Sequence, residues 1–154
     1  MPFFFWFYLL YSFMGYLSTS FITTQIHLNN TQIQSKSLRM ESYPFEIFDD
    51  GGQITIMAPI ENEDLFTKYY RLFEKHGYSG NGESWAGIIE QIIEKEDPAL
   101  LDSIEFDPEA GAFYCSVDSK QTQQRFVELL SPIFSNLSLL EKYLMSADRD
   151  RIYD

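Results

Sequence analysis

The acidic residues of this 154-residue chain all lie after residue 39, and this asymmetry limits which parts can fold together. Residues 1–39 carry two cations, Lys36 and Arg39, and no Asp or Glu. Residues 40–154 carry the other 9 cations and all 23 acids, a balance of 9 − 23 = −14. A chain of this length ordinarily forms one domain. We therefore predict an N-terminal extension over residues 1–39 and a single domain over residues 40–154.

The extension has two interpretations. Residues 3–21 form an uncharged, aromatic run of about the 20 residues that a helix needs to cross a bilayer. As a membrane anchor, this run would be followed by Lys36 and Arg39, which favour a cytoplasmic position for the domain. Alternatively, translation starts at Met40 and the domain is cytoplasmic without an anchor. The abrupt change of composition at Met40 favours the second interpretation, and the fold prediction uses neither.

Hydrophobic periodicity predicts the order ββααββαα in residues 40–154. Alternating apolar residues predict two hairpins, over residues 45–56 and 104–117, with turns at residues 49–52 and 107–111. Apolar residues three or four positions apart predict two helices between the hairpins and two after them. A charged tail, residues 148–154, follows the last helix. This order predicts an α+β domain in which helices pack on one face of two antiparallel hairpins.

Turn and cap residues predict the backbone conformation at single positions. Gly51 is expected in a primed hairpin turn, and both Asn81 and Gly111 in left-handed conformations. The expected caps are Asn62, Ser84 and Asp97; the third helix is expected to start at Asp118 or Ser119, and the fourth at Asn136 or Ser138. Pro132 should kink or interrupt the third helix, because a proline removes a helical hydrogen bond.

No residue set in the domain has the pattern of a catalytic or metal centre. Cys115 is the only cysteine, so neither an intrachain disulfide nor a thiolate zinc cluster can form. It shares strand parity with Phe113 and Val117, which places it in the core. His76 falls in the last turn of a helix, where it can meet free carbonyl groups. We expect no enzyme activity, no cofactor and no metal; a carboxylate-based esterase or glycosidase is the least favoured class.

Carboxylates form one pattern on the second predicted helix. Glu83, Glu90 and Glu94 lie within about 40° of one another, opposite the apolar stripe that contains Trp85. Such a stripe is either a solvated face or a contact for basic residues of a partner. Excess negative charge makes nucleic acid a poor partner and a basic protein surface a suitable one.

Two segments resemble motifs of a family of bacterial proteins. Residues 77–87, GYSGNGESWAG, look like the N-G-x-x-W-x-G segment of immunity family fifty-one, and residues 106–113, FDPEAGAF, look like its F-D-x-E-x-G-x-F hairpin. The spacing of the motifs and the leucine-rich helices over residues 125–144 are also similar, so that the likeness covers residues 44–146. The motif positions here are Gly80, Asn81, Gly82, Trp85, Gly87, Asp107, Gly111 and Phe113. Ala86 replaces the acidic residue associated with that place in the family.

The resemblance implies an immunity protein of a polymorphic toxin system. Such a protein binds and neutralises a cognate toxin stoichiometrically, without catalysis, and it supplies no catalytic residues to carry over. A different class stays open: a membrane-tethered sensor or ligand-binding module, anchored by residues 3–21. A product that is soluble when expressed from Met40 would disfavour the tethered module.

Overall fold

The computed structural model describes residues 41–152, together with Gln25 and His27. Residues 39–154 form one compact unit, and residues 1–38 are assigned to a separate one. The run over residues 3–21, on which the membrane-anchor interpretation depends, lies outside the described residues. Among the helices that the structure does describe, none is both long and apolar enough to cross a membrane.

Four antiparallel strands form one sheet in the order β1–β2–β4–β3. The strands are β1 (Glu46–Asp49), β2 (Ile54–Ala58), β3 (Ile104–Phe106) and β4 (Phe113–Val117). Both predicted hairpins are confirmed, and they join through β2 and β4, where Ile56 lies opposite Cys115. Every second residue of β2 and β4 is buried. One face of the sheet therefore lines the core, as alternation requires.

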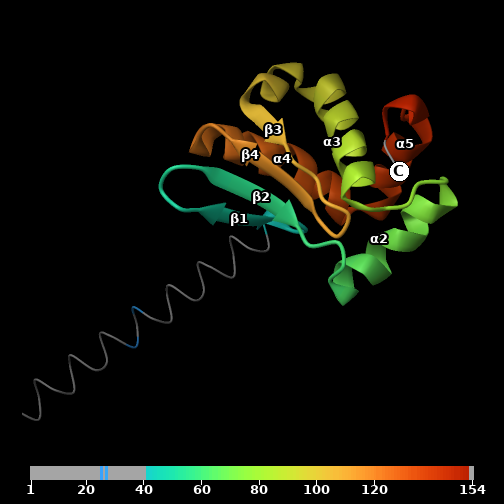
Figure 1. Cartoon of the computed structure of the whole chain (residues 1–154), viewed down its shortest axis with the longest axis horizontal. Coiled ribbons are helices and arrows are strands. Elements are labelled where there is room, and N and C mark those ends of the chain that lie inside the picture. Colours follow the sequence, from blue (N-terminus) through green and yellow to red (C-terminus); the bar gives the residue numbers. More distant parts are fainter. Residues whose placement is uncertain (1–24, 26, 28–40, 153–154) are drawn as a thin grey trace, which may run out of the picture. The chain divides into compact units, whose positions relative to one another are not determined.

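The helices cover that inner face and extend beyond it. They are α2 (Glu63–Lys75), α3 (Gly82–Glu96), α4 (Lys120–Ser135) and α5 (Leu137–Ser146), with short 3₁₀ helices η1 (Pro98–Ser103) and η2 (Arg149–Arg151). Helix α3 packs along β4, α4 packs across β2 and β4, and α5 packs against α2 and α4. Figure 1 shows the strands on one side of the domain and α2 and α5 on the other, with α3 between them. The order ββααββαα confirms the predicted α+β class.

Aromatic rings fill the space between these elements. Trp85 of α3 is fully buried, and its ring centroid lies 4.9 Å from Tyr69 of α2 and 4.8 Å from Phe134 of α4. The Tyr69 hydroxyl donates a hydrogen bond of 2.8 Å to the Phe134 carbonyl oxygen, so this buried polar group is paired. The predicted burial of Trp85 is confirmed, and its indole joins three helices.

The first hairpin turn differs from the primed turn that we predicted. Four residues, 50–53, connect the strands; Gly51 has a φ of 85°, whereas Gly52 does not have a positive φ. The Asp49 carboxylate accepts the Gly51 N–H at 3.0 Å, and the Asp50 carboxylate accepts the N–H groups of Gly52 and Gln53 at 3.1 and 3.0 Å. Side-chain oxygens thus order a longer loop that the Asp-Gly pair alone does not specify.

The start of α3 also corrects two expectations. Gly80, not Asn81, takes the left-handed conformation, with a φ of 73°. Asn81 is extended and caps the helix, because its side chain accepts the Ser84 N–H at 2.8 Å. Ser84 is not the cap; its hydroxyl oxygen accepts the Gly80 N–H at 3.2 Å. The helix therefore begins at Gly82.

Two further local expectations are wrong, and so is one of the two effects predicted for Pro132, an interruption of its helix. Gly111 has no positive φ. Asp97 makes no side-chain cap for η1, because its carboxylate binds the Arg125 guanidinium of α4 at 2.7 Å. Pro132 does not interrupt α4, which continues to Ser135. By contrast, the predicted cap Asn62 is confirmed, and of the two alternatives for each later helix the structure has Ser119 at α4 and Asn136 at α5.

Candidate partner-binding surface

The two sequence motifs meet in space at Gly82. A Cβ atom on Gly82 would lie 2.0 Å from the Glu109 carbonyl oxygen and 2.2 Å from that of Ala112. Glu109 and Ala112 exchange backbone hydrogen bonds of 3.0 and 3.2 Å, which fix the turn that supplies both carbonyls. Because this turn is backbone and cannot move aside as a side chain can, the N-terminus of α3 needs glycine at this position.

The same turn also holds the segment before α2. The Glu61 N–H donates to the Gly111 carbonyl oxygen at 3.1 Å. A Cβ on Gly111 would lie 2.7 Å from Cδ of Glu61, the far end of an exposed side chain that can move aside, so the contact favours a small residue here without requiring glycine. The turn between β3 and β4 therefore fixes the starts of both α2 and α3.

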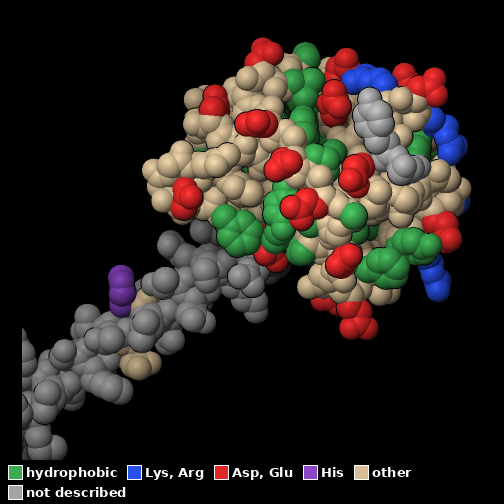
Figure 2. Space-filling model, viewed as in Figure 1, with side chains coloured by type: hydrophobic (Ala, Val, Ile, Leu, Met, Phe, Trp, Pro, Cys, Tyr) green, Lys and Arg blue, Asp and Glu red, His purple; other side chains and the backbone are tan. Residues whose placement is uncertain are grey.

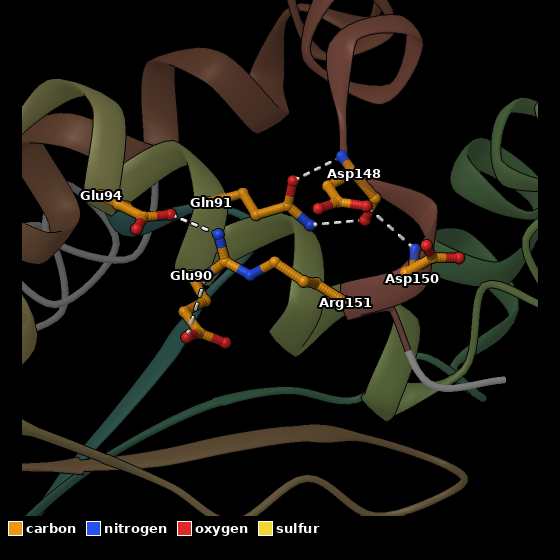
Figure 3. Close-up of polar contacts among 6 residues, drawn as sticks. All are labelled: Glu90, Gln91, Glu94, Asp148, Asp150 and Arg151. Carbon is orange, nitrogen blue, oxygen red and sulfur yellow. Dashed lines mark hydrogen bonds and ion pairs between the residues drawn. The ribbon is translucent and has the colours of Figure 1, made fainter.

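Gly87 makes room for the C-terminal segment. A Cβ there would lie 3.0 Å from the Arg151 carbonyl oxygen and 3.1 Å from Cα of Ile152, a residue only 7% exposed. Figure 3 shows how Gln91 of α3 clamps the same segment: its Nε2 donates to the Asp148 carbonyl at 3.1 Å, and its Oε1 accepts the Asp148 N–H at 2.7 Å. Residues 148–152 are thus packed on α3, which corrects our prediction of a charged tail.

Two of the three predicted partner-binding carboxylates share one internal cation. The Arg151 guanidinium lies 3.3 Å from Glu90 and 2.5 Å from Glu94 (Figure 3). The side chains of Glu90 and Glu94 are still 44% and 52% exposed. The predicted face therefore points to solvent, but Arg151 offsets one of its two charges.

Glu83 stands apart from that pair. It lies in the first turn of α3, about 10 Å along the axis from Glu90, where the helix dipole favours a negative charge. Its Oε2 is buried and has no hydrogen-bond partner within the described part of the chain. The structure thus does not bring Glu83, Glu90 and Glu94 into one uniform surface, and their role in partner binding stays a prediction.

Exposed hydrophobic side chains are the feature that sequence reasoning missed. Four large ones stand out: Phe48 (50% exposed), Phe66 (47%), Tyr70 (37%) and Met145 (71%). Phe66 and Tyr70 each follow a buried residue of α2, so they fall out of phase with the apolar stripe. The sequence carries this signal: Phe66 and Tyr70 lie on the polar side of an amphipathic helix, where aromatic side chains do not pack into the core.

The residues considered for catalysis have structural roles. Cys115 lies in the core as predicted, and burial raises the pKa of its thiol to about 12, so that the reactive thiolate is disfavoured at neutral pH. His76 ends α2 as predicted, and its Nε2 lies 3.1 Å from Oε1 of Glu141 in α5. Lys75 binds the same carboxylate at 2.6 Å. Both side chains therefore tie α2 to α5.

Comparison with known proteins identifies a family. The family model described as Immunity protein 51 matches residues 45–149, a range that contains all four strands, helices α2 to α5 and both sequence motifs. No curated protein and no solved structure matches the chain.

Proposed function

Because the chain belongs to the Immunity protein 51 family, we propose that it protects a bacterial cell by binding a cognate protein toxin. Binding neutralises the toxin one molecule for one, without turnover. The family match is the observation that carries this proposal, and it extends over the whole sheet and the four helices that surround it. In this proposal, the protein binds the toxin in the cytoplasm.

The arrangement of the motif residues supports a binding protein rather than an enzyme. Backbone or side-chain atoms of other segments lie close to Gly82, Gly87 and Gly111. Trp85 is buried among aromatic rings. These residues hold helices, turn and C-terminal segment together and present no reactive group. Rigid positioning of a surface lowers the entropy lost when a partner binds.

The charge of the domain indicates the chemistry of the partner. Figure 2 shows acidic side chains spread over the visible face, with Lys and Arg side chains gathered near its edge. A toxin with a basic surface, such as one whose substrate site binds phosphate groups, complements this distribution. Attraction of this kind mainly raises the association rate, and salt screens it over about 8 Å at physiological ionic strength.

Titration of a toxin tests both binding and stoichiometry. The candidate toxins are products of genes next to this one that stop growth when expressed alone. Coexpression of this chain should restore growth, and residual toxin activity should fall to zero at a molar ratio of one to one. A toxin from an unrelated system is the control and should stay active. Inactivation of many toxin molecules by one molecule of this protein would contradict the non-enzymatic mechanism.

A further inference from the structure

An aromatic pair lies on the outer side of α2. The rings of Phe66 and Tyr70 stack with centroids 4.7 Å apart and planes 21° apart. At about 100° per residue, Glu63 and Glu74 share with them a sector of about 80° on the helix. All four side chains belong to exposed residues. We call this set, Glu63, Phe66, Tyr70 and Glu74, the outer face of α2.

The aromatic pair contributes little to the core. The buried stripe of α2 consists of Leu65, Tyr69 and Phe73, and it already packs against the Trp85 indole, with ring centroids 4.9 and 5.9 Å from those of Tyr69 and Phe73. Isolated exposed hydrophobic residues are common on protein surfaces, whereas adjacent ones form a patch that favours contact with another protein. Aromatic residues are enriched in the centres of protein interfaces and often dominate the binding energy there.

The polar surroundings of the pair are acidic. The Tyr70 hydroxyl donates to Oε1 of Glu74 at 3.3 Å, which holds a carboxylate beside the ring. Two cations of the same helix are engaged inside the domain: Lys68 lies 4.4 Å from the Tyr43 ring centroid, and Lys75 binds Glu141. The third cation, Arg71, is exposed and lies about 100° around the helix from Tyr70 and about 60° from Glu74, so it borders these side chains without sharing their sector. Figure 2 shows hydrophobic side chains exposed over α2, with acidic side chains and a Lys or Arg side chain beside them.

The helix that presents this face is firmly placed. Its start follows Glu61, which is bonded to Gly111 in the turn between β3 and β4, and Asn62 caps it by accepting the Asp64 N–H at 3.0 Å. Its far end is joined to α5 through Glu141. A face on a fixed helix loses little conformational entropy on binding, which suits a tight inhibitor.

We propose that the outer face of α2 is the surface that contacts the toxin, an inference that rests on the proposed function. The matching toxin surface presents Arg or Lys side chains beside an apolar pocket. An arginine can stack on Phe66 or Tyr70 and pair with Glu63 or Glu74, which combines cation–π and ionic contacts. Charge complementarity selects this occupant: the two carboxylates that share the sector with the rings disfavour an acidic partner.

Two other surfaces are weaker candidates. The acidic face of α3 already carries its own cation, Arg151. The uncovered side of the sheet presents Phe48 with the exposed acids Glu46 and Glu105, but no second hydrophobic residue there is among the large exposed ones. The outer face of α2 combines two stacked aromatic rings with two carboxylates.

Truncation of the pair tests the proposal. The double variant F66A/Y70A should keep the wild-type melting temperature, because both side chains are exposed, and it should bind the growth-arresting product of the neighbouring gene at least about 30-fold more weakly. The matched control is F48A, which removes an equally exposed aromatic ring from the sheet and should change the dissociation constant by less than about twofold. Equal binding by F66A/Y70A and wild type, or a greater loss in F48A, would overturn the proposal.

A charge-matched pair of variants tests the ionic part. E63Q/E74Q and E46Q/E105Q remove the same number of charges from α2 and from the sheet. The first should slow association more and flatten its salt dependence more than the second, and equal effects would contradict a specific contact at α2.

A photocrosslinking side chain at position 66 supplies a readout that does not depend on stability. It should link to the toxin, whereas the same group at position 48 should not; the reverse pattern would assign the interface to the sheet. If the wild-type chain neither binds nor inhibits the toxin, the proposed function itself fails. If the wild type inhibits while position 66 gives no crosslink, only the location of the interface is wrong.

Discussion

At the scale of single residues, Trp85 of α3 is the fully buried side chain that contacts rings of both α2 and α4. Its ring stacks on Phe73 with planes 2° apart and contacts Tyr69 and Phe134. We expect Trp85→Ala to lower the free energy of unfolding by about 3–5 kcal/mol, measured by denaturant titration, because a cavity replaces a fully buried indole. Typical domain stabilities are about 5–15 kcal/mol, so the variant should unfold easily.

Trp85→Phe is the matched control for that substitution. It keeps an aromatic ring and removes the indole Nε1, which has no hydrogen-bond partner within the described residues. We expect it to lose less stability than Trp85→Ala. An unchanged melting temperature in Trp85→Ala together with lost toxin protection would show that the indole contacts the partner instead.

Gly82 tests the contact between the two motifs. Gly82→Ala should destabilise the protein by about 3 kcal/mol, at the upper end for overpacking, because its Cβ would meet two backbone carbonyl oxygens at 2.0 and 2.2 Å. Gly52→Ala is the control, since the nearest atom to its Cβ is 3.8 Å away and its φ is not positive. Similar melting temperatures for the two variants would contradict the tight contact.

At the scale of elements, local pattern predicted strands and helices but not how distant elements meet. Alternation in residues 104–117 and the stripe of Trp85, Ile89 and Ile92 are local signals that packing reinforces. Gly82, in contrast, is required by the backbone of another segment, so the reason for glycine at this position is invisible along the chain. The left-handed conformation that we predicted for Asn81 occurs at Gly80 instead; both residue types tolerate left-handed backbone, so local pattern does not choose between them.

The C-terminal segment was missed for a similar reason. Its charged residues suggest a solvated tail, and a single Ile152 gives no periodicity, yet this side chain fills the space beside Gly87. The exposed aromatic pair of α2 carries no local signal of binding, and Tyr69 and Phe73 already satisfy the helical pattern without it. Sequence thus indicates which residues can be buried more readily than which exposed residues bind.

Removal of residues 148–154 tests the docking of that segment. The truncated protein should lose about 2–4 kcal/mol of stability, since it loses the buried Ile152 side chain and the two hydrogen bonds of Gln91. The exposed ion pairs of Arg151 add little to this loss. Gly87→Ala should reproduce part of the effect by displacing the segment. Thermal melting that is unchanged by the truncation would show that the segment contributes no stabilising contact.

At the scale of the whole molecule, many Lys and Arg side chains contact other residues of the domain. The excess Asp and Glu side chains therefore dominate the charge that faces solvent. Ion pairs or ring contacts engage Lys68, Lys75, Lys95, Lys120, Arg125, Arg149 and Arg151. These contacts fix helices to one another and to the first hairpin. The acids that remain, with the −14 balance of residues 40–154, set the field that a basic partner experiences.

Substitution of Glu90 and Glu94 tests how much these two negative charges raise the rate of association with the toxin. Replacing both with Gln removes two charges, so association with the toxin should slow and its salt dependence should flatten, while the fold is kept because both side chains are about half exposed. We expect a smaller change than for E63Q/E74Q, because Glu90 and Glu94 act with Arg151 as a group of lower net charge. The measurement is the association rate at low and at high salt.

A second variant separates net charge from the ion pair itself. E94Q/R151Q removes one negative and one positive charge, so the net charge is unchanged although the pair with Glu94 is lost. Its association rate should match that of wild type at both salt concentrations. If E90Q/E94Q also matches wild type, the acidic face of α3 is only solvated and the attraction arises elsewhere; if E94Q/R151Q is as slow as E90Q/E94Q, the geometry around Arg151, rather than long-range charge, controls association.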